Sequence, residues 1–446
     1  MRLVDRCIDA AAHSAATVEV WRRQRRSMER LPAQLADALL QRLAARRLLF
    51  PSLLEVFQRS VEEVDLSGFV AVDAEWLAYL GSFRYLRVLK LADCKNVTNH
   101  AVWALSEHLD IWGSKTTNEG ASVFKAFTRL RFLNLSRTSV TRLALPLAMQ
   151  NLNMSNCTIH SICDEDSEFP IPLETFIASA ASFGNIDEIL SSIQGSSLLY
   201  LDLRACSLSN LSFIENMKNL VHVDLSSSGI TDDTIEHVAK IGANLKYLSL
   251  KDTWITSQAL FILAGTVPNL VSLSLAGTKI DDSALSYLSM MLLLRTLDLR
   301  ITWFAHTDET VDKILSMSEL ENIKYLESLN LEGVPLLAEV IPPLASITTL
   351  KFLYLRSDFL SDPGLHALSA ASNLERNANH IGTSQARKVN VANSLAGPSR
   401  LDFSIVESNL LPDLTDERIK YTKEELLELQ HLVESNLAMH AVQLPP

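Results

Sequence analysis

The chain has 446 residues, a formal net charge of −12 at pH 7 and a hydrophobic fraction of 48%. It contains no run of about 18 apolar residues that could cross a bilayer, and Asp5, Arg6 and Asp9 interrupt any apolar core of a signal peptide. We therefore expect no membrane partner and a cytoplasmic protein that can also enter the nucleus. Residues 1–60 carry eleven arginines against six acids, leaving about −17 for the remainder, so nucleic acid is not an expected partner.

The sequence of residues 1–60 predicts a helical N-terminal cap. Residues 1–30 contain no Gly or Pro, and a second helix is expected from Leu31 onward because Pro32 suits a first helical turn. Its apolar stripe has helical spacing and consists of Leu35, Leu39, Leu40 and Leu43. A third apolar run, residues 48–57, leads into an array of repeats, and the end of such an array needs a cover for its core.

Two other interpretations of this region stay open. The basic cluster of residues 21–26 is either a nuclear address, a phosphate contact or a solvated helix face. Leu31-Pro-x-x-Leu35 resembles the opening of an F-box or a related cullin-receptor box, and Phe50-Pro-Ser-Leu-Leu54 resembles the latter. This resemblance implies that residues 31–57 dock a cullin adaptor, although the Cys-Lys-x-Trp-like core of many F-boxes is missing.

From residue 61 to 374 the pattern Leu-x-x-Leu-x-Leu returns at a nearly fixed period, which is typical of a repeat solenoid. Its most regular block comprises Leu198-Leu201-Leu203, Leu220-Val223-Leu225, Leu245-Leu248-Leu250, Leu270-Leu273-Leu275 and Leu294-Leu297-Leu299. Alternation within each hit predicts a short strand with one face in the core. Intervening segments such as 233–242 carry apolar residues at helical spacing and end in glycine, so the predicted unit is strand then helix.

A ladder of small polar residues follows the strands, three positions after the last leucine. It consists of Cys206, Ser228, Thr253, Thr278 and Thr302, with Cys94 and Cys157 at equivalent places. We expect these side chains to bond backbone groups that the turn leaves unpaired, which leaves only Cys7 and Cys163 outside the ladder. A disulfide, metal or cofactor role is not expected for the cysteines.

These residues, followed by Ile-Thr-Asp (230–232) or Ile-Asp-Asp (280–282), resemble the cysteine-containing, plant-type (RNI-like) leucine-rich repeats. Asn96-Val97-Thr98 after Cys94 resembles that subfamily most closely. The resemblance covers roughly residues 61–370 and implies an α/β leucine-rich-repeat solenoid, a horseshoe with strands on its concave side. It says little about function, because such repeats serve ubiquitin-ligase receptors, signalling scaffolds and many other binders.

Three irregularities interrupt the period. Only 20 residues separate Leu89 from Leu109, which is consistent with a missing repeat, and 32 separate Leu294 from Leu326. The longer spacing predicts an extra loop around Trp303, Phe304 and His306, as a partner contact or a tolerated insertion. At residue 374 the pattern is aborted.

The outward positions of the strands predict a protein-binding surface on the concave face. Its candidate residues are Tyr200, Asp202, Arg204, His222, Asp224, Tyr247, Lys251, Asp298, Arg300, Glu332, Phe352, Tyr354 and Arg356. Asp202, Asp224 and Asp298 could alternatively form a carboxylate ladder for a metal, although repeat equivalence alone explains their recurrence. No phosphate loop, paired-His spacing or nucleophile elbow is present, so an enzyme is not expected.

Residues 375–409 are polar and predict a flexible linker, and residues 410–446 predict a helical tail. Thr422 and Glu425 form a capping box and Tyr421 and Leu426 a hydrophobic staple, so a helix should start at Thr422. Tyr421, Leu426 and Leu427 have the spacing Tyr-x-x-x-x-Leu-Leu, which resembles the motif that binds the mRNA cap-binding initiation factor. The resemblance implies helix-in-groove binding to that factor; the alternative is a tail helix that folds back on the last repeat.

The leading function is thus a non-enzymatic intracellular scaffold, which holds one protein on its concave face and recruits another through its tail. The runner-up is a substrate receptor of a cullin-type ubiquitin ligase, with residues 31–57 on the adaptor and the repeats on the target.

Overall fold

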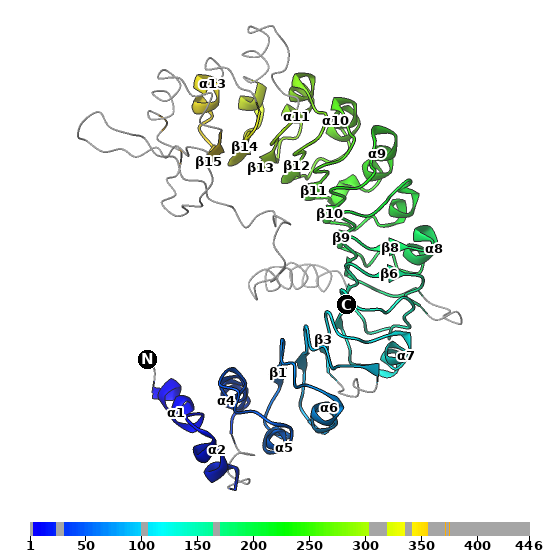
Figure 1. The fold of residues 1–446 in the computed structure, drawn as a ribbon. Helices are drawn as coiled ribbons and strands as arrows, with labels where there is room; N and C mark the ends of the chain where they lie inside the picture. The colour runs from blue at the N-terminus through cyan, green and yellow to red at the C-terminus, as the bar shows by residue number, and fades with distance from the viewer. Residues whose placement is uncertain are drawn as a thin grey trace, which may run out of the picture. The chain divides into compact units, whose positions relative to one another are not determined.

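Each repeat contributes one strand to a single parallel sheet in the computed structural model, which describes residues 3–23, 31–99, 106–163, 170–302, 319–334 and 341–355, with 371 and 374. The thirteen strands lie in the order β1-β2-β3-β4-β5-β7-β9-β10-β11-β12-β13-β14-β15, which follows the chain. The chain divides into two compact units, Met1–Glu375 and Arg376–Pro446. In the first unit the strands line one side and the helices the other (Figure 1), as an α/β repeat solenoid requires.

The strands are short. They are β1 (Glu63–Asp65), β2 (Val88–Lys90), β3 (His108–Asp110), β4 (Phe132–Asn134), β5 (Asn151–Asn153), β7 (Thr175–Ile177), β9 (Tyr200–Asp202), β10 (His222–Asp224), β11 (Tyr247–Ser249), β12 (Ser272–Ser274), β13 (Thr296–Asp298), β14 (Ser328–Asn330) and β15 (Phe352–Tyr354). A separate parallel pair consists of β6 (Thr158–Ile159) and β8 (Ser182–Phe183). The middle residue of each long-sheet strand is apolar, and from β1 to β14 it is buried in the core; Leu201, Val223 and Leu273, for example, are fully buried.

The helical segments that follow the strands vary more in length and type than the strands do. They are α6 (Ala74–Leu80), α7 (Asn118–Ala121), η3 (Phe124–Ala126), α8 (Ile186–Ser191), η4 (Ser212–Asn216), α9 (Asp232–Ala239), η5 (Gly242–Asn244), α10 (Ser257–Ala264), η6 (Asp282–Ala284), α11 (Leu285–Ser289), η7 (Glu319–Asn322) and α13 (Ile341–Ser346). Gly242 begins a 3-10 turn instead of ending a helix. A Cβ there would collide with the carbonyl oxygen of Thr266, so the close approach of the next repeat requires glycine.

The irregular spacings leave the sheet continuous. Leu89 pairs with Leu109 and Leu297 with Leu329, in the same register as the regular repeats. Twenty residues are therefore enough for one repeat, which is called a rung of the solenoid below, and the short spacing leaves no gap in the sheet. Trp303, Phe304 and His306 lie outside the described residues.

Of the helices before the first strand, α4 packs against β1, and α1 packs against α4. They are α1 (Leu3–Ala11), α2 (Ala15–Arg22), α4 (Ala33–Ala45), α5 (Pro51–Leu54) and the 3-10 turn η1 (Glu55–Phe57). The predicted helix of residues 1–30 is broken in two around Ser14, whose hydroxyl accepts from the backbone N–H of Thr17. Leu39, Leu40 and Leu43 of α4 are buried as the stripe predicts.

An aspartate of α4 replaces the missing neighbour of β1. In the regular rungs one carbonyl oxygen accepts two backbone N–H groups of the next rung; that of Leu199, for example, accepts from Val221 and His222. At β1 the Asp37 Oδ1 atom accepts instead from the N–H groups of Glu62 (3.0 Å) and Glu63 (3.2 Å). Burial raises the pKa of Asp37, while these two hydrogen bonds act in the opposite direction.

The polar ladder forms as predicted. Ser228, Thr253, Thr278 and Thr302 donate their hydroxyls to the carbonyl oxygen three residues earlier, at 2.5–2.7 Å, and Thr138, which was not predicted, does the same. The thiols differ, because each donates to the preceding rung. Cys94 reaches Leu66 O (3.2 Å), Cys157 reaches Leu135 O (3.3 Å) and Cys206 reaches Ala178 O (3.1 Å).

Candidate concave-face binding site

The strand face opposite the helices carries three rows of side chains. We define it by the first and third residue of each strand and the residue two positions further on; it is called the concave strand face below. Twelve predicted contact residues lie in these rows, namely Tyr200, Asp202, Arg204, His222, Asp224, Tyr247, Lys251, Asp298, Arg300, Glu332, Phe352 and Tyr354. Arg356 and the tail residues Tyr421, Leu426 and Leu427 lie outside the described residues.

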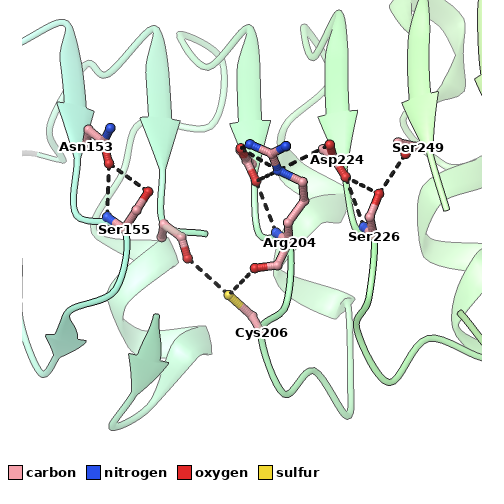
Figure 2. A network of polar contacts seen from close by, with 9 residues as sticks. Asn153, Ser155, Arg204, Cys206, Asp224, Ser226 and Ser249 are labelled. Carbon is pink, nitrogen blue, oxygen red and sulfur yellow. Dashed lines mark hydrogen bonds and ion pairs between the residues drawn. The ribbon is translucent and has the colours of Figure 1, made fainter. Parts of the chain in front are cut away.

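A buried ion network occupies β9 and β10 (Figure 2). Arg204 contacts Asp202 through two nitrogens, with Nε at 3.0 Å from both carboxylate oxygens and Nη2 at 2.6 Å from Oδ2. Its Nε also lies 3.4 Å from Asp224 Oδ2. Asp202 is fully buried and Arg204 is 3% exposed, so the two carboxylates share one guanidinium away from water.

Serine hydroxyls extend the network to β11. Ser226 donates to Asp224 Oδ1 at 2.5 Å, and its oxygen lies 2.7 Å from that of Ser249 (Figure 2). Burial and the charge of Asp202 raise the pKa of Asp224, against the opposing effect of Arg204. Burial alone would lower the pKa of Arg204, but the charge of Asp202 and the hydrogen bonds to it raise that pKa above its usual range.

Three stacked rings lie beside this network, one on each of three neighbouring strands. The ring centroids of Tyr200 and His222 are 4.2 Å apart at an interplanar angle of 17°, and those of His222 and Tyr247 are 5.6 Å apart at 26°. Burial lowers the pKa of His222 to about 4 against the opposing charge of Asp202, and the charge of Arg204 adds to the lowering, so the ring is neutral at pH 7. Tyr247 is 36% exposed and offers its ring to a ligand.

A similar arrangement, absent from the predicted contact residues, occurs on β1–β4. His108 and Phe132 stack at 3.8 Å with an interplanar angle of 7°, and burial lowers the pKa of His108 to about 4. Burial and the charge of Asp65 raise the pKa of Asp110, while Lys90 opposes that shift. These residues occupy the same strand positions as Tyr200 and Asp202, so extending the strand register to the first repeats would have found them.

A further ion pair lies on β13, three strands beyond β10. Arg300 contacts Asp298 through Nε and Nη2, both at 3.0 Å from a carboxylate oxygen, and Ser274 donates to Asp298 Oδ2 at 3.3 Å. Ser249 and Ser274 separate Asp298 from Asp224, so the predicted carboxylate ladder is interrupted. Within the described ranges no group of three His, Cys, Asp or Glu residues could hold a metal ion.

The predicted contact residues therefore fall into two kinds. Asp202, Arg204 and Asp224 are at least nine-tenths buried and satisfied by one another, and the equally buried Asp298 is held by Arg300 and Ser274. They act on a ligand through their electrostatic field and by holding the surrounding side chains in a fixed geometry. The aromatic rings beside them, above all that of Tyr247, supply exposed contact area.

Comparison with known proteins supports the fold. No family model and no curated protein matches the chain. An internalin (inlF) of Listeria monocytogenes is similar in structure, with a TM-score of 0.51 at 20% identity over 78% of this chain and 95% of that one. A leucine-rich-repeat protein of Leptospira interrogans has a TM-score of 0.48 at 18% identity, over 68% and 80% of the two chains.

A TLR13 complex with single-stranded RNA has a TM-score of 0.48 at 16% identity, over 74% of this chain and 55% of that one. With the thirteen-stranded parallel sheet, the likeness to the internalin establishes the leucine-rich-repeat solenoid fold predicted from the sequence. No helix in the described part of the chain is long and apolar enough to cross a membrane.

Proposed function

We propose that this leucine-rich-repeat protein is a non-enzymatic scaffold that binds a protein partner on its concave strand face. The observation that carries the proposal is the stack of Tyr200, His222 and Tyr247 beside the buried ion network. Aromatic side chains held on a rigid sheet contribute strongly to protein interfaces because little side-chain entropy is lost on binding. The buried Asp202–Arg204–Asp224 network beside these rings is internally paired, and it holds this part of the sheet rigid.

The test is purification of the intact protein from its own cells, compared with a Tyr200→Ala/Tyr247→Ala variant. We expect the variant to lose a partner that the wild-type protein retains. Phe261→Ala is the matched control, because Phe261 of α10 is an aromatic residue that is 59% exposed on the helical side. Equal partner recovery from all three proteins would contradict the proposal.

The tail adds a second partner to this proposal, the mRNA cap-binding initiation factor. Its support comes from the sequence alone: Tyr421, Leu426 and Leu427 match the motif, and the capping box favours a helix. The intact protein should be retained with that factor on a cap-analogue resin, and Leu426→Ala/Leu427→Ala should abolish retention. Gln430→Ala, also in the predicted helix, is the control; loss in both variants would point to unfolding of the tail.

The alternative is a cullin-type substrate receptor that uses residues 31–57. The contact of Asp37 with β1 supports the simpler role of a cap, because α4 already buries Leu39, Leu40 and Leu43. The half-buried Leu35 and the 36% exposed Phe50 could still reach an adaptor. Leu35→Glu/Phe50→Glu would then remove a co-purifying cullin and spare the concave-face partner; absence of any cullin from the wild-type complex rejects this alternative.

We also propose that the repeats belong to the cysteine-containing, plant-type subclass and that the protein acts in the cytoplasm or nucleus. The contacts of Cys94, Cys157 and Cys206 as free thiols support both points, since reduced thiols are typical of those compartments.

A further inference from the structure

Two sites on the concave strand face share one composition. The N-terminal acidic–aromatic site consists of Asp65, Asp110, His108 and Phe132, and the central acidic–aromatic site consists of Asp202, Asp224, Tyr200, His222 and Tyr247. Repeat periodicity does not explain the pair, because β5 and β7 between them carry Asn151, Asn153, Thr175 and Ile177 at the same positions. A ligand that contacts both sites would account for the recurrence.

Acids outnumber bases at both sites. At the N-terminal site Glu63, Asp65 and Asp110 face one cation, Lys90, whose Nζ lies 3.0 Å from Glu63 Oε1. At the central site Asp202 and Asp224 share Arg204. The other charged groups described on this face beyond β10 are Lys251, Glu332 and the Asp298–Arg300 pair. Burial is the main cause of the raised pKa values of Asp110 and Asp224, and the neighbouring carboxylates of Asp65 and Asp202 add to it.

The aromatic rings at both sites also favour a cationic ligand. An aromatic face attracts a cation through its quadrupole, and most strongly when water is partly excluded. With pKa values of about 4, His108 and His222 are neutral at pH 7 and do not repel a cation. The chain already shows such stacking at the border of this face, where the Arg137 guanidinium lies 5.5 Å from the ring centroid of Trp112.

An unsatisfied hydroxyl lies between the two sites. Ser179 is 8% exposed and its Oγ has no hydrogen-bond partner among the described residues. The equivalent Ser155 donates to Asn153 Oδ1 at 2.8 Å (Figure 2), but β7 has Ile177 in place of that asparagine. Ser179 lies in the same row as Arg204, and a polar ligand group crossing β7 would satisfy it.

We propose that the concave strand face binds an extended basic segment of a protein partner, with one cationic side chain at each acidic–aromatic site and the connecting backbone across β5 and β7. Five strand spacings separate β3 from β10, a distance of about 24 Å that an extended peptide spans in about seven residues. This inference rests on the proposed function and adds the chemistry and spacing of the partner.

The probe is a fluorescent Gly/Ser/Ala peptide with two arginines seven residues apart, titrated into the full-length protein and followed by anisotropy. Peptides with two glutamates at those positions, or with arginines three residues apart, should bind at least tenfold more weakly. Asp110→Asn/Asp224→Asn should weaken binding of the first peptide at least tenfold. Asp187→Asn/Asp233→Asn removes the same charge from exposed positions of α8 and α9 and should change it less than twofold.

Tyr247→Ala keeps every charge and should weaken binding of the first peptide three- to tenfold. This variant tests the inference if the aspartate variant does not fold. Equal loss in the two aspartate pairs, or equal binding of the arginine and glutamate peptides, would overturn the inference. Retention of the natural partner by two variants distinguishes failure of this inference from failure of the proposed function. If Tyr200→Ala/Tyr247→Ala loses that partner and Asp110→Asn/Asp224→Asn retains it, the concave face binds protein but not through a basic segment.

Discussion

At the scale of single residues, the three ladder cysteines have a structural role that makes their thiols unreactive. Burial raises the pKa of Cys94 and Cys206 to about 11, and it also raises that of Cys157. The nucleophilic form of cysteine is the thiolate, so these side chains should not react in the folded protein near pH 8. Exposed Cys7 and half-buried Cys163 lie outside the ladder.

We therefore predict that a disulfide reagent at pH 8 labels Cys7 and Cys163 in the native protein. Cys94, Cys157 and Cys206 should react only after denaturant is added. Peptide mapping by mass spectrometry identifies the labelled positions. Rapid labelling of Cys206 in the native state would mean that the ladder opens without global unfolding.

The Asp202–Arg204–Asp224 network predicts a large cost for removing its cation. Arg204→Met would leave two buried carboxylates without their guanidinium, and breaking such a buried pair typically costs about 3–5 kcal/mol of unfolding free energy. Urea denaturation measures this loss. Arg129→Met is the control, because Arg129 pairs with Glu107 at 2.7 Å but is 55% exposed, and exposed pairs contribute about 0–1 kcal/mol. A loss below about 1 kcal/mol for Arg204→Met would show that the carboxylates become hydrated or protonated without cost.

At the scale of elements, α4 terminates the sheet through one carboxylate. Asp37→Ala leaves the N–H groups of Glu62 and Glu63 without their acceptor, and hydrogen bonds to a charged group contribute about 1.5–3 kcal/mol. We expect a loss of that order in unfolding free energy and faster hydrogen exchange at these two amides. Asp37→Asn retains an accepting Oδ1 and should lose less than half as much; equal losses would assign the effect to the charge instead of the hydrogen bonds.

The elements also show what a single sequence can and cannot reveal. Leu-x-Leu alternation was sufficient to place β9–β13, because each buried leucine leaves the same periodic signal. The ladder was predicted as well, but the carbonyl oxygen that accepts from each side chain was not. Thr253 Oγ1 donates within its own repeat, whereas Cys206 Sγ donates to the preceding repeat. Likewise nothing in the sequence around Asp37 marks it as the acceptor for β1, since that contact depends on how α4 docks.

The concave face shows the same limit. Strand periodicity placed Asp202 and Arg204 on the correct side of the sheet. Their near-complete burial follows from the contact between neighbouring rungs, which one sequence does not contain. A second ladder was missed altogether: Asn219, Asn244 and Asn269 donate their side-chain amides to Ser196 O, Lys218 O and Ala243 O of the preceding repeats, at 2.7–3.0 Å. An asparagine directly before the first leucine is its signature in the sequence.

At the scale of the whole molecule, rung-to-rung pairing makes stability depend on sites far apart in the sequence. His108 and His222 belong to different rungs and both have folded-state pKa values of about 4, against about 6.5 for an unfolded chain. Between these values the unfolded state binds more protons, so acid favours unfolding. Their contribution to stability is complete above about pH 6.5 and is lost as the pH falls toward 4.

Buried carboxyls act in the opposite direction. The pKa values of Asp110 and Asp224 are raised in the folded protein, so their contribution is present at low pH and is lost as the pH rises through the raised values. Because the two effects overlap between pH 4 and 6.5, the total stability curve does not separate them. Differences between the wild-type protein and single variants do.

We predict that the unfolding free energy of wild-type protein minus that of His222→Gln rises between pH 4.5 and 7, by about 1–2 kcal/mol after allowance for partial solvent screening. For Asp224→Asn the same difference should fall over this range, which gives a control of opposite sign. Urea titrations at four pH values measure both. A difference for His222→Gln that stays constant with pH would mean that the imidazole is hydrated in the folded state, and the stacked rings of Tyr200, His222 and Tyr247 would then lie open to water.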